Sequence, residues 1–197
     1  MDEFILIFLN SLASLGYVGI AVGLMIEVIP SEIVLGYGGF LVSQEKINFF
    51  GAVIAGTIGG TFAQLFLYWA GFYGGRPFLL KYGRYIFIRE KHITIAEKWF
   101  EKYGPGVIFT ARFIPVVRHA ISIPAGIAKM SWQKFTFYTI SAIVPWTVFF
   151  LYIGVKLEEN WQHIDEVAAP YIEPVIITSI FFTIGYIGMK LIRKSGK

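Results

Sequence analysis

The chain has 197 residues, of which 56% are hydrophobic and only 15% are charged, with a formal net charge of +4. Soluble domains normally carry about 25% charged residues, so this composition predicts a polytopic membrane protein, with one membrane domain over residues 1–197. A soluble protein with a large core is disfavoured, because runs such as 175–189 are too apolar and too long. The absence of cysteine excludes disulfide bonds and thiolate metal sites. Acidic residues follow Met1, so we expect no cleaved signal peptide.

The N-terminal part of the chain predicts a broken helical hairpin. Residues 4–14 are apolar but short, whereas residues 16–42 are long enough to cross a bilayer of about 30 Å. Four residues interrupt the middle of that run: Glu27, Pro30, Ser31 and Glu32. Proline breaks a helix, and carboxylates at membrane depth are costly unless they face protein or water. We therefore expect a re-entrant hairpin over residues 16–42 that lines a cavity rather than a plain crossing.

A glycine-rich transmembrane helix is expected over residues 49–73, which completes a first repeat over residues 15–75. Gly56 and Gly60 have the spacing that lets two helices pack closely. Gln64 and Tyr68 lie one turn apart and would add polar groups to the cavity. The next segment, residues 76–105, is basic and has apolar residues at helical spacing, which predicts an amphipathic helix on the membrane face. A nucleic-acid patch is the weaker alternative, because cytoplasmic loops carry the same basic excess.

The second half of the chain holds a similar hairpin. Residues 110–126 place two arginines, Arg112 and Arg118, and His119 in an otherwise apolar run. Pro115, Ser122 and Pro124 lie in the same stretch, so we expect a second re-entrant hairpin over residues 106–128. A transmembrane helix with a proline kink follows over residues 131–155, which completes a second repeat over 106–155. A C-terminal transmembrane helix is expected over residues 174–192.

The charges of the loops predict the topology. Basic residues cluster in the 76–105 segment and at the C-terminus, whereas the loop at 158–173 is acidic. Basic loops remain in the cytoplasm, so we expect the C-terminus to be cytoplasmic and the acidic loop to lie outside. Residues 106–128 then start and end on the same face.

The two halves also resemble each other in spacing. Arg112 follows Glu27 by 85 residues, and Pro115 follows Pro30 by the same interval. One span separates the two hairpins, so they would enter from opposite faces. This predicts an all-α membrane fold with inverted-topology repeats, as in many secondary transporters, although two apolar segments can also resemble each other by chance.

The charges inside the apolar runs suggest a transport site. A guanidinium suits phosphate, so Arg112 and Arg118 are expected to bind an anionic headgroup. Burial disfavours the charged form of a carboxylate, so Glu27 and Glu32 are expected to exchange protons or to pair with the arginines. A purely structural ion pair, a snorkelling Arg118 and a bystander His119 remain alternatives. Pro30, Ser31, Gln64, Tyr68, Pro115, His119, Ser122 and Pro124 are the expected cavity-lining residues.

Three motifs together resemble the DedA family of bacterial membrane proteins. They are the EVIPSE segment at 27–32, the YWAG segment at 68–71, and the RFIPVVR segment at 112–118 followed by PAG at 124–126. The resemblance covers residues 15–155 and is nearest to the Gram-positive undecaprenyl-phosphate transporters. It implies two re-entrant hairpins, a cytoplasmic-membrane location and transport of undecaprenyl phosphate or phosphatidylethanolamine, with a link to the proton-motive force. Glu27, Arg112, Arg118 and Glu32 take the family's essential positions. Gln64 departs from the pattern, because many members have an acid there.

Other functions remain open at this stage. A proton-coupled small-molecule exporter shares the fold and the acids but needs no arginine pair. A lipid phosphatase needs a nucleophile with a base, and only His119 lies near Ser122 in the sequence. An assembly role is the last alternative. We expect a transporter with no catalytic residues, no cofactor, no bound metal and no nucleic-acid partner. Its expected partners are membrane lipids and protons, and a homo-oligomer is compatible with the sequence.

Overall fold

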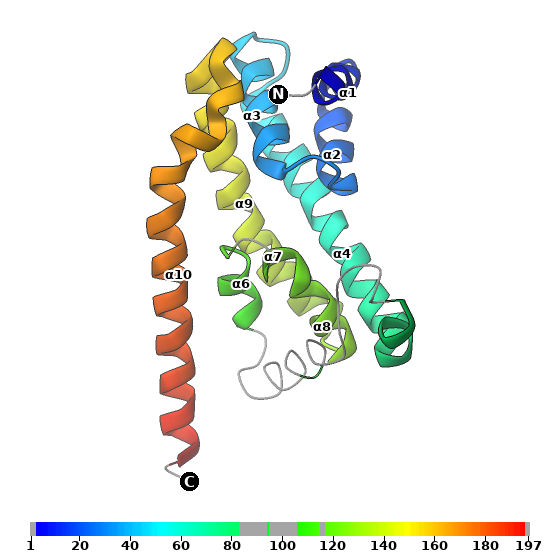
Figure 1. Ribbon diagram of the computed structural model, residues 1–197, viewed down its shortest axis with the longest axis vertical. Helices are drawn as coiled ribbons and strands as arrows, with labels where there is room; N and C mark the ends of the chain where they lie inside the picture. Colours follow the sequence, from blue (N-terminus) through cyan, green and yellow to red (C-terminus); the bar gives the residue numbers. More distant parts are fainter. Residues whose placement is uncertain (1–2, 83–93, 95–105, 115–116, 196–197) are drawn as a thin grey trace. The chain divides into compact units, whose positions relative to one another are not determined.

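The computed structural model describes residues 3–82, 94, 106–114 and 117–195, and the elements in these ranges are helical (Figure 1). Most of the basic segment at 76–105 lies outside the described residues, and so does Pro115. The chain forms two compact units. We call Met1–Ala63 with Ile143–Glu173 the N-terminal unit, and Gln64–Ala142 with Pro174–Lys197 the arginine unit. The long helices α4 (Phe49–Tyr82), α9 (Trp132–Leu157) and α10 (Ile164–Ser195) contribute to both.

The N-terminal unit begins with three short helices, α1 (Glu3–Ala13), α2 (Tyr17–Ile26) and α3 (Ser31–Ser43). Glu27 ends α2 in a left-handed conformation with φ 53°, and Pro30 precedes α3. The predicted helix break is therefore confirmed. Helices α2 and α3 pack against each other. A Cβ at Gly23 would lie 3.1 Å from Val34, and one at Gly38 would lie 3.2 Å from Ile20.

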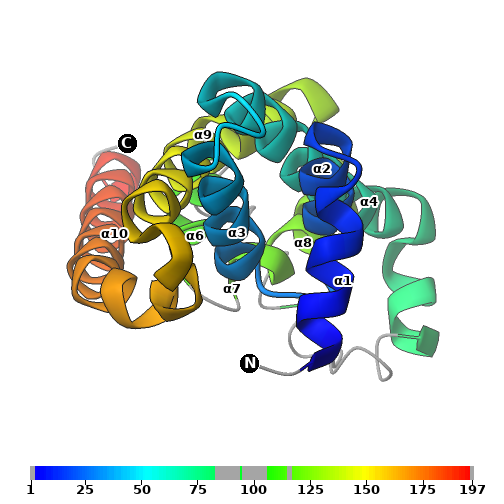
Figure 2. The ribbon, with the colours of Figure 1, turned by 90° about the horizontal axis from the view of Figure 1, so that it is seen from above.

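The acidic stretch at 158–173 differs from our expectation of a loop. It forms the 3-10 helix η2 (Glu158–His163) and then the first turns of α10, which lie beside α3 (Figure 2). Tertiary packing explains the difference. The Trp161 ring meets Tyr37 of α3 edge-on at 4.9 Å, and a Cβ on Gly36 would meet Ile164. These buried apolar contacts hold the acidic segment in helical form.

The arginine unit combines the second part of α4 and the start of α9 with three short helices. These are α6 (Val107–Ala111), α7 (Val117–Ala120) and α8 (Ser122–Ile127). Glycines let α8 lie directly on α4: a Cβ on Gly71 would come within 2.2 Å of the Ile123 oxygen, and one on Gly126 within 2.1 Å of the Tyr68 oxygen. This backbone contact fixes α8 against α4.

A stripe of large apolar side chains, exposed at every fourth position, winds around α4. The stripe contains Phe50, Ile54, Ile58, Phe62 and Phe66, each more than 40% exposed. A continuous apolar surface of this kind is typical of contact with lipid. Among the described residues, two helical stretches are long and apolar enough to cross a membrane, Phe49–Gly75 and Trp132–Thr178. Length, composition and exposure therefore agree on a membrane protein.

We expect Gly126→Ala to destabilise the protein, because its new Cβ would collide with backbone atoms of Tyr68 and Phe72 that cannot move aside. Overpacking of this kind costs about 1–3 kcal/mol. The matched control is Gly60→Ala, whose Cβ would lie 3.5 Å from Ile143, an ordinary contact distance. Thermal unfolding in detergent should show a lower midpoint for Gly126→Ala and no loss for Gly60→Ala. Equal midpoints would contradict the close α4–α8 contact.

Candidate functional site

The arginine unit contains a buried cluster of polar side chains around Arg112. Arg112 follows the last turn of α6 and is 6% exposed. Its Nη1 donates to Gln64 Oε1 and to the Arg118 carbonyl, each at 2.5 Å. Its Nη2 donates to Ser122 Oγ at 3.1 Å and to Thr139 Oγ1 at 3.0 Å. These four acceptors come from α4, α7, α8 and α9, so the guanidinium connects four helices of the unit.

The acceptors are themselves ordered by further contacts. Ser122 is fully buried and donates its hydroxyl to Gln64 Oε1 at 2.7 Å. The Arg112 guanidinium lies 5.5 Å from the centre of the Phe135 ring. On α4 the Tyr68 ring stacks on Phe135 with centres 4.6 Å apart. Tyr68 is 2% exposed and donates its hydroxyl to the Met130 carbonyl.

The geometry of the cluster suits an oxyanion. These four acceptors are uncharged oxygens, and they occupy both terminal nitrogens of the guanidinium. A phosphate can present two oxygens to such a fork and adds negative charge, which makes its hydrogen bonds stronger. A phosphate can therefore replace Gln64 and Ser122 as the acceptors of Arg112. In the conformation seen here, Arg112 is held by protein groups.

The predicted acids lie in the N-terminal unit, at the break between α2 and α3. Glu27 is exposed and Glu32 is partly buried. Glu32 accepts a hydrogen bond from the Ser31 hydroxyl at 3.0 Å, and Pro30 is exposed beside them. The Glu32 carboxylate also repels that of Asp165, in the first turn of α10. The acids and the arginines belong to different units, so their proposed pairing stays a prediction.

The structure brings together five of the predicted site residues in the arginine unit. Arg112, Gln64 and Ser122 contact one another, the Arg118 carbonyl joins them, and Tyr68 lies one stacked ring away. Pro124, in α8, is partly buried. Pro115 and the side chain of His119 lie outside the described residues.

Three residues of the Arg112 cluster and of the acidic group around Glu32 were not predicted from the sequence: Phe135, Thr139 and Asp165. Phe135 and Thr139 are completely buried and stand one turn apart on α9. A polar residue one turn after an aromatic one inside an apolar helix is the signal that points to them. Asp165 has no such signal, because its neighbour Glu32 is far away in the sequence.

These features define a helical membrane protein with a buried arginine site and a broken helical hairpin. The VTT domain model matches residues 29–156 of the chain. The chain therefore belongs to the VTT domain family, as its DedA-like motifs predicted.

Three curated relatives carry informative names. The chain is 58% identical to "Undecaprenyl phosphate transporter A" of Bacillus subtilis (strain 168), over 87% of each chain. It is 28% identical to "Undecaprenyl phosphate transporter A" of Staphylococcus aureus (strain NCTC 8325 / PS 47), over 89% of this chain and 92% of that one. It is 34% identical to "Alkaline phosphatase-like protein" of Lactococcus lactis subsp. cremoris (strain MG1363), over 94% of this chain and 90% of that one. No solved structure matches the chain.

Proposed function

We propose that the protein is a transporter that moves a phosphate-bearing lipid, undecaprenyl phosphate, across the bacterial cytoplasmic membrane. The observation that carries the proposal is the buried Arg112 fork, surrounded by neutral acceptors that a phosphate can replace. Its setting among apolar helices explains why the ligand would be a lipid rather than a soluble phosphate. The 58% identity to a relative named for this transport supports the choice of lipid.

In the proposed mechanism, Arg112 exchanges its protein acceptors for the lipid phosphate. The phosphate displaces Gln64 and Ser122, and Arg112 holds it while Arg118 adds a second positive charge. Glu27 and Glu32 exchange protons at the break between α2 and α3. The two repeats, over residues 15–75 and 106–155, have inverted topology, and each contains a re-entrant hairpin, over residues 16–42 and 106–128. The C-terminus lies in the cytoplasm.

Transport in liposomes tests the proposal. Purified wild type is reconstituted with undecaprenyl phosphate, and lipid that reaches the opposite leaflet is measured by its accessibility to a membrane-impermeant reagent. We expect wild type to move the lipid. Arg112→Ala should lower the rate by about 100-fold, because it removes the phosphate fork and leaves buried acceptors unsatisfied. Equal rates for wild type and Arg112→Ala would contradict the proposal.

Glu27→Gln tests the role of the acid in the same liposomes. If Glu27 exchanges protons, wild-type transport should respond to a pH gradient, and transport by Glu27→Gln should be slow and independent of it. A gradient-dependent Glu27→Gln protein would contradict a proton-exchange role for this residue.

The alternatives give different readings in this assay. Movement of phosphatidylethanolamine alone would indicate a phospholipid flippase of the same family. No lipid movement by well-folded wild type would favour a small-molecule exporter. Release of inorganic phosphate would indicate a phosphatase, as the name of the Lactococcus relative suggests.

A further inference from the structure

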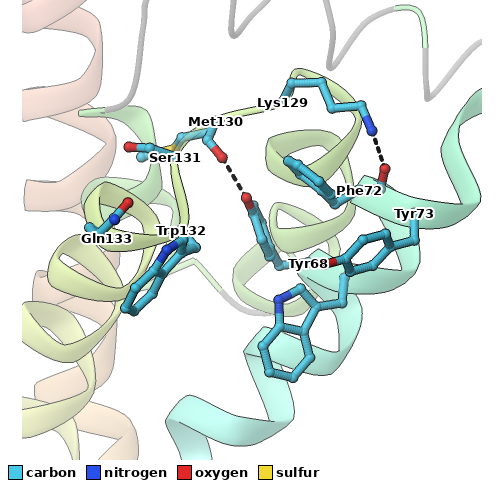
Figure 3. A pocket seen from close by; sticks show the side chains of 9 residues that line it. Tyr68, Phe72, Tyr73, Lys129, Met130, Ser131, Trp132 and Gln133 are labelled. Atoms are coloured by element: carbon cyan, nitrogen blue, oxygen red, sulfur yellow. Dashed lines mark hydrogen bonds between the residues drawn. The ribbon is translucent and has the colours of Figure 1, made fainter.

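A cavity in the arginine unit has Tyr68 in its wall, and the proposed transport mechanism does not use it. Its volume is about 520 Å³, within the range of ligand-binding pockets. Two short segments line it, residues 68–73 of α4 and residues 129–133 at the start of α9 (Figure 3). The lining residues are Tyr68, Trp69, Phe72, Tyr73, Lys129, Met130, Ser131, Trp132 and Gln133.

The composition of the wall defines the chemistry of a ligand. Five of the nine lining residues are aromatic, and Lys129 carries the only formal charge among them. The Lys129 ammonium lies 4.0 Å from the centre of the Phe72 ring and donates to the Phe72 carbonyl. Aromatic walls with a single cation suit an anionic head attached to a hydrocarbon chain. The described lining has no acid that would bind the amine of a zwitterionic lipid.

The position of the cavity along the chain fits the membrane interface. One candidate span ends at Gly75, directly after the α4 segment, and the other begins at Trp132. Tyr73 and Trp132 are exposed, at 80% and 57%. Tryptophan, tyrosine and lysine concentrate at the depth of lipid headgroups. The cavity therefore opens where a lipid phosphate would lie.

Lys129 occupies a backbone position that normally belongs to glycine. Its φ is 51°, and it follows α8 in a Schellman turn closed by hydrogen bonds from Lys129 N to Gly126 O and from Met130 N to Ala125 O. Glycine is the usual residue at this position because it has no Cβ penalty. The turn aims the lysine side chain at α4, where the two dashed contacts of Figure 3 join the loop to the helix.

The cavity is also connected to the arginine cluster. Tyr68 forms part of its wall, and the same ring stacks on Phe135, which in turn lies under Arg112. The hydrogen bond from the Tyr68 hydroxyl to the Met130 carbonyl fixes the Tyr68 ring in this position. A lipid phosphate in the cavity would thus stand two rings away from the guanidinium.

We propose that this cavity is an interfacial binding site for the phosphate head and adjoining isoprenoid units of the transported lipid, with Lys129 as its phosphate ligand. The inference deepens the proposed function and rests on it. The lipid is held at the headgroup level by Lys129 and the aromatic wall before or after it contacts Arg112.

Photo-crosslinking tests the site without relying on transport. The full-length protein in phosphatidylcholine nanodiscs is irradiated with a diazirine-bearing prenyl monophosphate, and the labelled peptides are identified by mass spectrometry. We expect labels in residues 68–73 and 129–133. Excess farnesyl phosphate should remove them, whereas inorganic phosphate or farnesol at the same concentration should not. Competition by inorganic phosphate would overturn the lipid assignment, and equal competition by farnesol would overturn the role of the phosphate.

Variants of Lys129 test the ligand. Lys129→Asn removes the charge but keeps a residue that tolerates a left-handed backbone, and it should lower labelling by about fivefold or more. Lys129→Arg keeps the positive charge and should be labelled as strongly as wild type. The matched control, Lys134→Asn, removes an exposed lysine outside the lining and should leave labelling unchanged. Full labelling of Lys129→Asn would overturn the proposal.

The liposome assay separates the two proposals. Labelling of the cavity without lipid movement by wild type would refute the transport function and leave the binding site standing. Lipid movement by wild type with labels elsewhere on the chain would refute the cavity and leave the transport function standing.

Discussion

Arg112→Lys should lower transport of undecaprenyl phosphate by about tenfold or more, although it keeps the positive charge. The ammonium of lysine is a point charge and cannot direct two separate nitrogens at Gln64, the Arg118 carbonyl, Ser122 and Thr139. It also cannot form the parallel pair of hydrogen bonds that a guanidinium makes with phosphate. The measurement is the initial rate of lipid movement in liposomes, normalised to the amount of folded protein. Full activity of Arg112→Lys would rule out a role for the fork in phosphate binding.

A structural role for Arg112 predicts a different pattern, which a second variant can reveal. Thr139→Val keeps the shape of the side chain and removes one acceptor of Arg112. It should cost about 1–3 kcal/mol of stability, because a buried donor of a charged group loses a partner. If Arg112 serves only to hold the helices together, transport by Thr139→Val and Arg112→Lys should fall in proportion to their loss of thermal stability. If Arg112 binds phosphate, Thr139→Val should retain transport at temperatures where it is folded.

The local features of the fold could be predicted from the sequence because they have local causes. Pro30 has no backbone N–H and clashes with the residue four positions earlier, and α2 ends at Ile26, four residues before it. The apolar run at 131–155 gave the bounds of α9 to within two residues at either end, since length and hydropathy determine such a span. Arg112 stood out because a charge inside an apolar run requires buried partners.

The features that the sequence did not predict depend on distant contacts. The acidic stretch at 158–173 has the composition of a loop, and only the burial of Trp161 and Ile164 against α3 makes it helical. Thr139 became a site residue because α9 brings it to Arg112, 27 positions away in the sequence. Lys129 was not predicted as a site residue, because its contact with Phe72 spans 57 positions.

Gln64→Glu is the variant that best tests how Arg112 exchanges its partners. Gln64 Oε1 accepts from both Arg112 and Ser122, so the substitution places a carboxylate at the centre of the cluster without changing its shape. A carboxylate forms a stronger, charge-assisted hydrogen bond to the guanidinium than an amide does. The phosphate must then compete with a charged acceptor. We expect transport at neutral pH to fall by about tenfold, which corresponds to about 1.4 kcal/mol of added competition.

The sign of the pH dependence follows from the same competition. The new carboxylate is favoured in its charged form by Arg112, so it competes at neutral pH and releases the guanidinium only when it is protonated in acid. Transport by Gln64→Glu should therefore rise as the pH falls, relative to wild type measured at each pH. The control is Gln162→Glu, the same change at an exposed position of η2, whose ratio to wild type should stay constant. A Gln64→Glu protein with wild-type rates at every pH would show that Gln64 does not compete with the lipid for Arg112. The expected outcome would mean that the amide of Gln64 allows Arg112 to exchange its protein acceptors for phosphate at neutral pH.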